Sequence, residues 1–385
     1  MMRMKNKADV VIVGGGINGC SLAYTLAKKG IDIAVVERNY ISSGATGACG
    51  AGIRQQWSTK ENTELAIKSV KIFEKLSKEL GEDIEFCQGG YLIAIHDEKD
   101  MKQAKKNVGM QRALGLKVDI LTPEKIIDVV PILDVQGMHA IGATFCPTDG
   151  LANPFKTTFA YANAARRNGA EIYTHTKVVG IKTNNKKISA VKTDKGTIKT
   201  PTIVNATGVW SKQIAEMAGI KIPNVPFRKE IMATERLKPL FEAMVISFND
   251  GIYFSQQEEG QIVGGIPIPD QKSGYRTMPT ILFVQHMAKT LTQYAPSLKH
   301  VNMLRHWTGF YDVTPDSRPI LGEDNTISGF IHCHGFSGHG FMLSPMVTTL
   351  LSEFIADGKT SDILETLHLD RFKGKHIEHE MAVVG

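Results

Sequence analysis

The segment from Ala8 to Glu37 constrains the fold more than any other part of the chain. An apolar run leads directly into a G-x-G-x-x-G pattern at Gly14, Gly16 and Gly19, and a second apolar run ends on Glu37. Gly14 permits a tight turn, Gly16 lets backbone N–H groups approach a pyrophosphate, and Gly19 lets a helix pack on the strand. The helix N-terminus attracts phosphate, and Glu37 can accept hydrogen bonds from a ribose. The sequence therefore predicts a strand–helix–strand unit that binds a dinucleotide.

Composition limits the remaining possibilities. The chain has 385 residues, enough for a large core and two lobes. Its formal net charge of +6 is not gathered into one basic block, which argues against a nucleic-acid partner. No run approaches the roughly 18 apolar residues of a membrane span, and we expect a cytoplasmic chain. The five cysteines lack metal-binding spacing, with each other or with histidine, so no metal site is predicted.

Four further segments favour a flavin over a nicotinamide. Residues 42–52 are almost all small, which allows close backbone approach to a flat group. An apolar strand at 202–208 ends in a second glycine turn, and 315–322 forms a compact turn before a strand. The glycine-rich stretch 334–342 opens the last helix, expected at about 345–357. A helix N-terminus there could stabilise negative charge on a reduced flavin.

Two other patterns describe the rest of the chain. A capping box at 58–61 predicts an amphipathic helix that runs to Leu80. Alternating polar and apolar residues from about 225 to 270 predict an antiparallel sheet. Because no linker separates the lobes, we expect a mixed α/β fold in which a Rossmann-type FAD-binding domain is interwoven with an antiparallel-sheet substrate domain. The expected boundaries are 1–84, 146–215 and 318–385 for the first domain, and 85–145 and 216–317 for the second.

Specific motifs extend over nearly the full length. They are CGAGIRQQW at 49–57, GYL at 90–92, PTDG at 147–150, TPDS at 314–317 and GFSGHGFM at 335–342. With these motifs the chain resembles the FAD-dependent amino-acid oxidoreductases of the D-amino-acid oxidase superfamily, and among them the β subunits of L-proline dehydrogenase and sarcosine oxidase. The resemblance implies that family's fold and a small amino acid as substrate.

The resemblance also implies roles for individual residues. Arg54 falls where sarcosine oxidases bind the substrate carboxylate, and an arginine fork suits a carboxylate. Tyr253 matches a tyrosine of the substrate pocket, and a buried sheet position is an equal alternative for it. His339 is a candidate general base, but a structural hydrogen bond is favoured over catalysis for it. Met342 stands where monomeric sarcosine oxidase has a lysine that also binds the substrate carboxylate. Lys229 or Arg228 could take the place of that lysine here. Core packing is the default for Trp57, Trp307 and Tyr311.

Other positions bear on oxygen and on flavin attachment. The lysine that helps oxidases react with oxygen falls on Ile262, which favours a dehydrogenase. Gly309 and Pro154 replace residues that link FAD and FMN covalently in sarcosine oxidases. We therefore expect FAD to be bound non-covalently. The resemblance is also compatible with FMN at a subunit interface in a complex. The predicted cofactor contacts are Gly14, Gly16, Ile17, Asn18, Gly19, Glu37, Arg38, Ser43, Ala45, Thr46, Gly50, Ala51, Gly52, Val178, Ala206, Thr207, Gly208, Trp210, Gly309, Gly335, Phe336, Ser337, Gly338, His339, Gly340, Phe341 and Met342.

The predicted function is oxidation of the C–N bond of a small secondary amino acid by hydride transfer to flavin N5. The sequence does not separate L-proline, sarcosine and hydroxyproline. Electrons would pass to other subunits of a heteromeric dehydrogenase or to another acceptor, and any membrane association would run through those partners. Two alternatives stay open: a sarcosine or glycine oxidase that produces hydrogen peroxide, and a non-catalytic subunit that only carries FAD.

Overall fold

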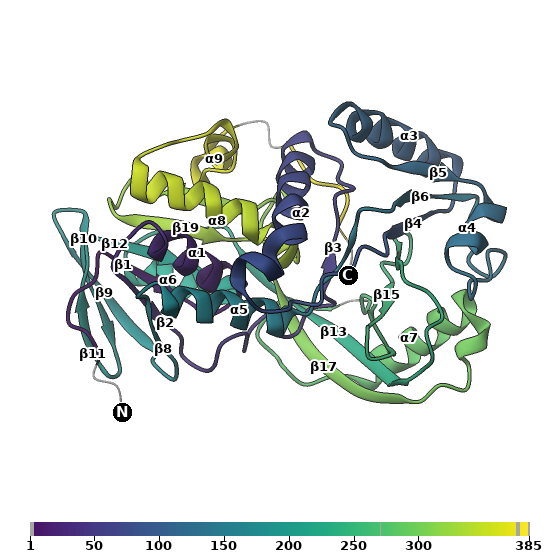
Figure 1. The fold of residues 1–385 in the computed structure, drawn as a ribbon, viewed down its shortest axis with the longest axis horizontal. Coiled ribbons are helices and arrows are strands. Elements are labelled where there is room, and N and C mark those ends of the chain that lie inside the picture. Colours follow the sequence, from purple (N-terminus) through teal and green to yellow (C-terminus); the bar gives the residue numbers. More distant parts are fainter. Residues whose placement is uncertain (1–3, 270, 375–377, 384–385) are drawn as a thin grey trace.

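The computed structural model describes residues 4–269, 271–374 and 378–383. Two large sheets organise the described chain, and they lie at opposite ends of the view in Figure 1. The six-stranded sheet has the order β18-β19-β12-β1-β2-β8 and is parallel except for β18. Its strands are β1 (Val10–Val13), β2 (Ile33–Val36), β8 (Glu171–Tyr173), β12 (Thr202–Asn205), β18 (Ile320–Glu323) and β19 (Phe330–His334). Segments far apart in the sequence thus meet in one sheet, as expected for interwoven lobes.

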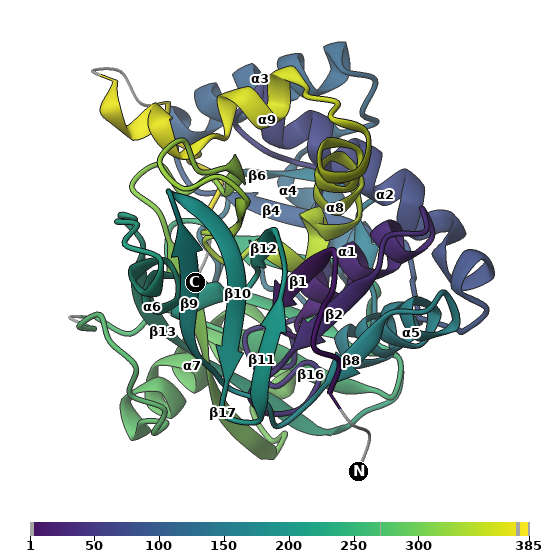
Figure 2. The same cartoon turned by 90° about the vertical axis from the view of Figure 1, so that its left-hand side faces the viewer.

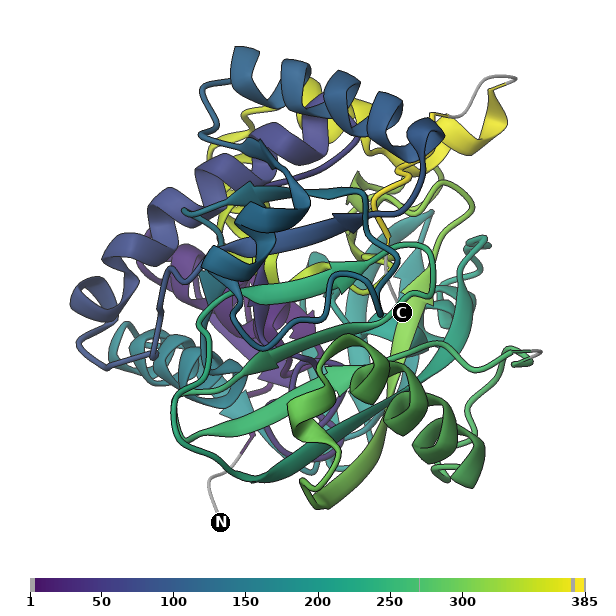
Figure 3. The same ribbon diagram turned by 90° about the vertical axis from the view of Figure 1, so that its right-hand side faces the viewer.

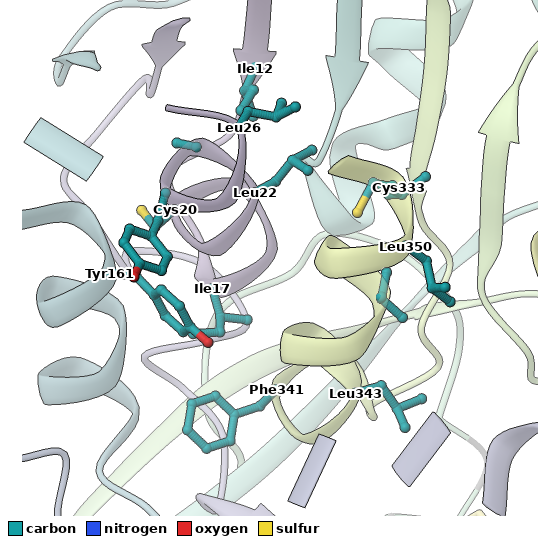
Figure 4. Packing of buried hydrophobic residues seen from close by; sticks show 14 of the residues in the cluster. Ile12, Ile17, Cys20, Leu22, Leu26, Tyr161, Cys333, Phe341, Leu343 and Leu350 are labelled. Carbon is teal, nitrogen blue, oxygen red and sulfur yellow. The ribbon is translucent and has the colours of Figure 1, made fainter. Parts of the chain in front are cut away.

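Helices cover one face of this sheet because its strands are apolar on both faces. They are α1 (Ile17–Ala27), α2 (Lys60–Leu80), α5 (Pro154–Arg167) and α8 (Gly340–Asp357), and their side chains share one core with β1 and β19. In Figure 4, α1 and α8 lie side by side, with Leu22 on the side of α1 that faces α8 and Tyr161 of α5 beside Cys20. This core holds the glycine-rich loop before α1 next to the start of α8.

A smaller layer covers the other face. It consists of the antiparallel strands β9 (Val178–Asn184), β10 (Lys187–Thr193) and β11 (Gly196–Lys199), together with α6 (Ser211–Met217) (Figure 2). Strands β10 and β11 pair as an antiparallel hairpin. Several short elements complete this half. Strand β3 (Gly52–Ile53) pairs with β7 (Gly150–Leu151), and the short helices are η1 (Gly208–Trp210), α9 (Asp362–Thr366) and η3 (Leu369–Lys373).

The eight-stranded sheet, seen in Figure 3, is mostly antiparallel, as its alternating sequence predicts. Its order is β17-β13-β16-β15-β14-β4-β6-β5. The strands are β4 (Tyr91–Ile95), β5 (Asp119–Leu121), β6 (Gly142–Cys146), β13 (Val225–Arg236), β14 (Met244–Ser247), β15 (Tyr253–Gln256), β16 (Gln261–Gly265) and β17 (Met303–Val313). One face packs on α4 (Pro123–Val129), α7 (Ile281–Tyr294) and η2 (Pro296–Leu298), and α3 (Glu98–Ala113) lies near β5.

Two helix ends differ from the sequence prediction. Helix α8 begins at Gly340, five residues before the expected start, and contains Pro345. Pro345 is the sixth residue of α8 and has no N–H, so the helix lacks one internal hydrogen bond at this position. Helix α2 begins after Thr59, but the predicted capping box does not form, because the Ser58 and Thr59 hydroxyls donate to Glu380 instead.

The helices of the described segments include none with the length and apolar character that crossing a bilayer requires.

Candidate active site

One pocket extends along the carboxyl ends of β1, β2, β12 and β19, where open parallel sheets bind ligands, and reaches the inner face of the eight-stranded sheet. It brings together residues from Val13 to Met342. Every predicted cofactor contact except Gly19 lines this pocket, as do Arg54 and Tyr253. Residues that no motif indicated also line it, among them Gln213, Met244 and Asp312.

The glycines of the first loop permit close packing. Gly14 has φ +112°, and a Cβ there would lie 2.5 Å from the carbonyl oxygen of Ala206. A Cβ on Gly19 would lie 2.0 Å from the carbonyl oxygen of Gly14. Gly19 therefore serves the helix–strand contact that the motif requires. It was predicted as a cofactor contact, but it does not line the pocket.

The far end of this loop carries the predicted acid. Glu37 accepts hydrogen bonds from the backbone N–H of Gly15 at 2.7 Å and of Asn39 at 2.8 Å. Beside it, the guanidinium of Arg38 lies 3.8 Å from the centre of the Trp210 ring. A carboxylate next to a cation stacked on an indole offers polar and flat surfaces for an adenosine.

The other end of the pocket contains a buried arginine. Arg54 is 1% exposed and lies with its guanidinium carbon 4.3 Å from the centre of the Trp57 ring. Its Nη2 donates to the carbonyl oxygen of Ala382, whereas its Nη1 is buried without a hydrogen-bond partner among the described residues. None of the ion pairs in the described chain includes Arg54, and burial lowers its pKa. A buried charge of this kind requires an anion, which the pocket can admit.

Three tyrosines surround this end: Tyr91, Tyr253 and Tyr311. Burial raises the pKa of each above its ordinary value, to about 12 for Tyr311, so all three are neutral phenols. Tyr253 lies where the resemblance implied. Tyr311, for which core packing was the default, lines the pocket, while Trp57 and Trp307 are not among its lining residues.

Lys229 provides a second cation. It extends from β13 opposite Gly309 of β17, with its Nζ 5.3 Å from the centre of the Tyr311 ring. Burial lowers the pKa of Lys229 to about 8. Arg228, the alternative from the sequence, pairs with Glu230 at 3.1 Å and does not line the pocket. Of the two candidates, only Lys229 can act on a ligand in this pocket.

Ile262 occupies the opposite face of the sheet. It is fully buried in the core of the substrate half, with Met232 and Phe254. Tyr253 pairs with Gly265 in the neighbouring strand, and side chains alternate between the two faces. Because Ile262 is three residues from Gly265, its side chain points away from the pocket. The lack of lysine at this position therefore carries no information about oxygen, which corrects the argument from the resemblance.

The positions linked with covalent flavin carry no reactive side chain. Gly309 lines the pocket, and a Cβ there would lie 3.0 Å from the Cβ of Ala48. Cys49 and Cys333 also line the pocket, but burial raises the pKa of their thiols to about 11 and about 12. The thiolate is the reactive form of cysteine, so both are unreactive near neutral pH. Pro154 is the first residue of α5 and is not a lining residue.

The loop before α8 is held by an acid that no motif indicated. Asp312 accepts hydrogen bonds from the backbone N–H of Gly335 at 2.7 Å and from Asn224 at 2.9 Å. His339 precedes α8 and packs edge-on against Trp57, with ring centres 4.5 Å apart. Burial and then the charge of Arg54 hold its pKa well below the ordinary value, so its imidazole is neutral.

The remaining histidines of interest form a polar chain. His332 contacts Asp324 at 3.2 Å and His334 at 2.9 Å, and His334 contacts Asn224 at 3.1 Å. In the part of the chain that the structure describes, no group of three His, Cys, Asp or Glu residues could hold a metal ion.

Comparison with known proteins decides what kind of dinucleotide protein has this pocket. The family model described as FAD-dependent oxidoreductase, DAO, matches residues 9–354. The chain belongs to this family. The β subunit of sarcosine oxidase from an Arthrobacter species is 30% identical over 99% of this chain and 95% of that subunit.

Solved structures of other DAO-type proteins are also similar. L-proline dehydrogenase from P. horikoshii has a TM-score of 0.91 and 38% identity, covering 96% of this chain and 99% of that chain. Glycine oxidase from Bacillus cereus has a TM-score of 0.83 and 26% identity, covering 93% and 98%. The predicted family and fold class are confirmed.

The pocket of this DAO member suits FAD. The N-terminus of α1 points its first N–H groups at the loop, where Ile17 N donates to Thr46 Oγ1 at 3.1 Å. Asn18, which lines the pocket, has a buried Oδ1 without a hydrogen-bond partner among the described residues. With Glu37 at one end and the glycine-rich loop 335–340 at the other, these groups match the adenosine, phosphates and ring system of FAD.

Proposed function

We propose that this chain oxidises the C–N bond of a small secondary amino acid, of the L-proline, sarcosine or hydroxyproline type. The observation that carries the proposal is the buried guanidinium of Arg54, whose Nη1 has no partner among the described residues and which lines the pocket. A carboxylate would supply the missing anion and the missing acceptor together. The names of the two similar proteins, a sarcosine oxidase subunit and an L-proline dehydrogenase, support the same substrate class.

The residues around Arg54 suit such a substrate. Lys229 adds a second positive charge, and the three neutral tyrosines form a wall that carries no charge. Among described residues, the carboxylates that line the pocket are Glu37 and Asp312, and both already accept backbone hydrogen bonds. A cationic amine would therefore meet no free acid, so the substrate amine reacts in its neutral form.

FAD held by the residues of this pocket would supply the two-electron acceptor for a hydride from the substrate carbon, and the C=N bond would form from the nitrogen lone pair, giving an imine or iminium. The chain's own task is placement: Arg54 and Lys229 fix the carboxylate, and the aromatic side chains exclude water. The neutral imidazole of His339 packs on Trp57 and helps to fix the ring on which Arg54 stacks.

An anaerobic substrate screen tests the proposal. We expect L-proline, hydroxyproline or sarcosine to bleach the flavin absorbance of the holoenzyme, and glycine to do so poorly. No bleaching by any of these amino acids would contradict the proposal and would support a subunit that only carries FAD.

An oxidase is the second candidate, and a specific observation favours it. Lys229 lies in the pocket, and a lysine near the flavin is the group that the resemblance associates with reaction with oxygen. The fold of glycine oxidase agrees with this candidate. Mixing the reduced holoenzyme with air separates the two: a dehydrogenase reoxidises far more slowly than it turns over, whereas an oxidase reoxidises as fast and releases peroxide.

The cofactors and partners of the chain are also part of the proposal. We propose that FAD is bound non-covalently and that other subunits or an electron acceptor take up the electrons. In such a complex, FMN at a subunit interface would be a further cofactor. We place the FAD-binding and substrate domains at the boundaries predicted from the sequence and the protein in the cytoplasm. Size-exclusion analysis of the complex isolated under native conditions, with flavin identified by chromatography, tests the partners and the second flavin.

A further inference from the structure

A short segment far from Arg54 in the sequence supplies the acceptor that its guanidinium has among the described residues. Residues 378–383 run next to the N-terminus of α2, with Glu380 and Ala382 buried and Met381 exposed. Glu380 N also donates to the carbonyl oxygen of Asp316 at 3.0 Å. The alternation of buried and exposed side chains is that of an extended segment fixed against a surface.

Glu380 anchors this segment. Its carboxylate is 3% exposed and accepts hydrogen bonds from six donors: the N–H and hydroxyl groups of Ser58 and Thr59, the Asn62 amide and the N–H of Ala382. Burial acts to raise its pKa, but the hydrogen bonds from Ser58 and Thr59 outweigh burial and hold the pKa below the ordinary value. The carboxylate also lies at the positive end of the α2 dipole, where an anion is stabilised.

The anchor fixes the acceptor on Arg54. Two residues beyond Glu380, the carbonyl oxygen of Ala382 accepts from Arg54 Nη2. The Ala382 side chain is 6% exposed and belongs to the same core as Trp57, on which the guanidinium stacks. The Ala382 carbonyl and the Trp57 indole therefore hold one side of the guanidinium. Nη1, which has no partner among the described residues, remains available to a ligand in the pocket that Arg54 lines.

We propose that residues 378–383 are a clamp that positions Arg54, with Glu380 as the positioning residue, and that the clamp makes Arg54 bind the substrate carboxylate through Nη1. This inference rests on the proposed function only for the identity of the ligand. A carbonyl held in this way is a fixed part of the site, because its anchor is a buried carboxylate that accepts six hydrogen bonds.

Glu380→Gln tests the clamp. The amide keeps the shape of the side chain but places an NH₂ group among donors, so the anchor should be lost. In the FAD-loaded protein, we expect the affinity for pyrrole-2-carboxylate, followed by the change in flavin absorbance, to fall about ten-fold, which corresponds to about 1.4 kcal/mol. KM for the amino acid should rise while kcat changes little. Binding of pyrrolidine, which has no carboxylate, should not change.

Glu378→Gln is the matched control, because it neutralises an acid two positions earlier whose side chain is 64% exposed and 3.5 Å from Arg318. It should leave carboxylate binding unchanged. Thr59→Val is the second variant, for use if Glu380→Gln does not fold, because it removes one donor to Glu380 and keeps the side-chain shape. We expect it to lower the affinity for pyrrole-2-carboxylate roughly three-fold.

Two results would overturn the clamp. Unchanged carboxylate affinity in Glu380→Gln and Thr59→Val would show that the segment does not position Arg54, and a higher affinity would show that it obstructs the site. Failure of the proposed function is distinguishable from both: no amino acid would then reduce the flavin, although the variants still alter the binding of pyrrole-2-carboxylate.

Discussion

A guanidinium that is removed from water loses solvation that only an anion or several acceptors can replace. Among the described residues Arg54 has one backbone acceptor and an indole, and its Nη1 has no partner there, so an anionic ligand would complete its contacts. We expect Arg54→Ala to lower kcat/KM for carboxylated amines by roughly 100-fold or more and to leave FAD bound. Steady-state kinetics and the flavin content of the purified variant measure these effects.

The control for this prediction is Arg112→Ala, since Arg112 is half-exposed and pairs with Asp119 on the surface. It should have wild-type kinetics. Equal kinetics for Arg54→Ala and the wild type would contradict the assignment of the carboxylate to Arg54.

Lys229 gives the pocket a dependence on pH. Burial lowers its pKa from 10.5 to about 8, so it is charged below that pH and neutral above it. An anionic ligand should therefore bind tightly at pH values below about 8, and its affinity should fall roughly ten-fold as the pH rises through this value. Pyrrole-2-carboxylate is a suitable probe because its own charge does not change there.

Lys229→Met should bind this probe weakly and without the change near pH 8, and Lys229→Arg should keep tight binding to higher pH. Titrations of the holoenzyme over this range provide the measurement. The same pH profile in the wild type and in Lys229→Met would show that another group titrates.

At the scale of elements, the unit from β1 to β2 follows its sequence closely. Its strands, its glycine turn and its helix all depend on contacts between residues near in sequence, which short patterns encode. Gly19→Ala should therefore disturb the unit, since the added Cβ would lie 2.0 Å from the carbonyl oxygen of Gly14. We expect a loss of stability of roughly 1–3 kcal/mol and a loss of bound FAD.

Gly109→Ala in α3 is the matched control because a Cβ there meets nothing within 4 Å. It should raise stability by up to about 1 kcal/mol. Thermal unfolding and the ratio of flavin to protein absorbance distinguish the two variants. Normal FAD content in Gly19→Ala would argue that the loop tolerates the displacement.

Helix ends were harder to predict than helices. The residues at 58–61 match a capping box, yet the N–H groups of Ser58 and Thr59, just before α2, donate to Glu380 more than 300 positions away in sequence. The start of α8 was expected after Pro345, but the packing of α8 against α1 and α2 extends it back to Gly340. In both cases a tertiary contact outweighs the local signal.

At the scale of the whole molecule, the pocket exists only when both large sheets are in place, because its lining comes from both. A ligand that binds only the folded state stabilises it by mass action, about 2.7 kcal/mol at a concentration of 100 Kd. We expect FAD to raise the Tm of the flavin-free protein clearly. FMN, which lacks the adenosine that Glu37 would bind, should raise it less. Equal shifts would contradict the placement of adenosine beside Glu37.

The sequence alone determined the dinucleotide unit, the preference for FAD and most residues of the pocket, since these depend on glycines and small residues at fixed local spacing. The tertiary structure decided which face of each strand meets the pocket. It turned Ile262 into the core, brought Lys229 to the ligand, and placed Asp312 and Ala382 beside the loop and the arginine. The physical reason is that pairing register and long-range hydrogen bonds set these positions, and neither leaves a repeating pattern in the sequence.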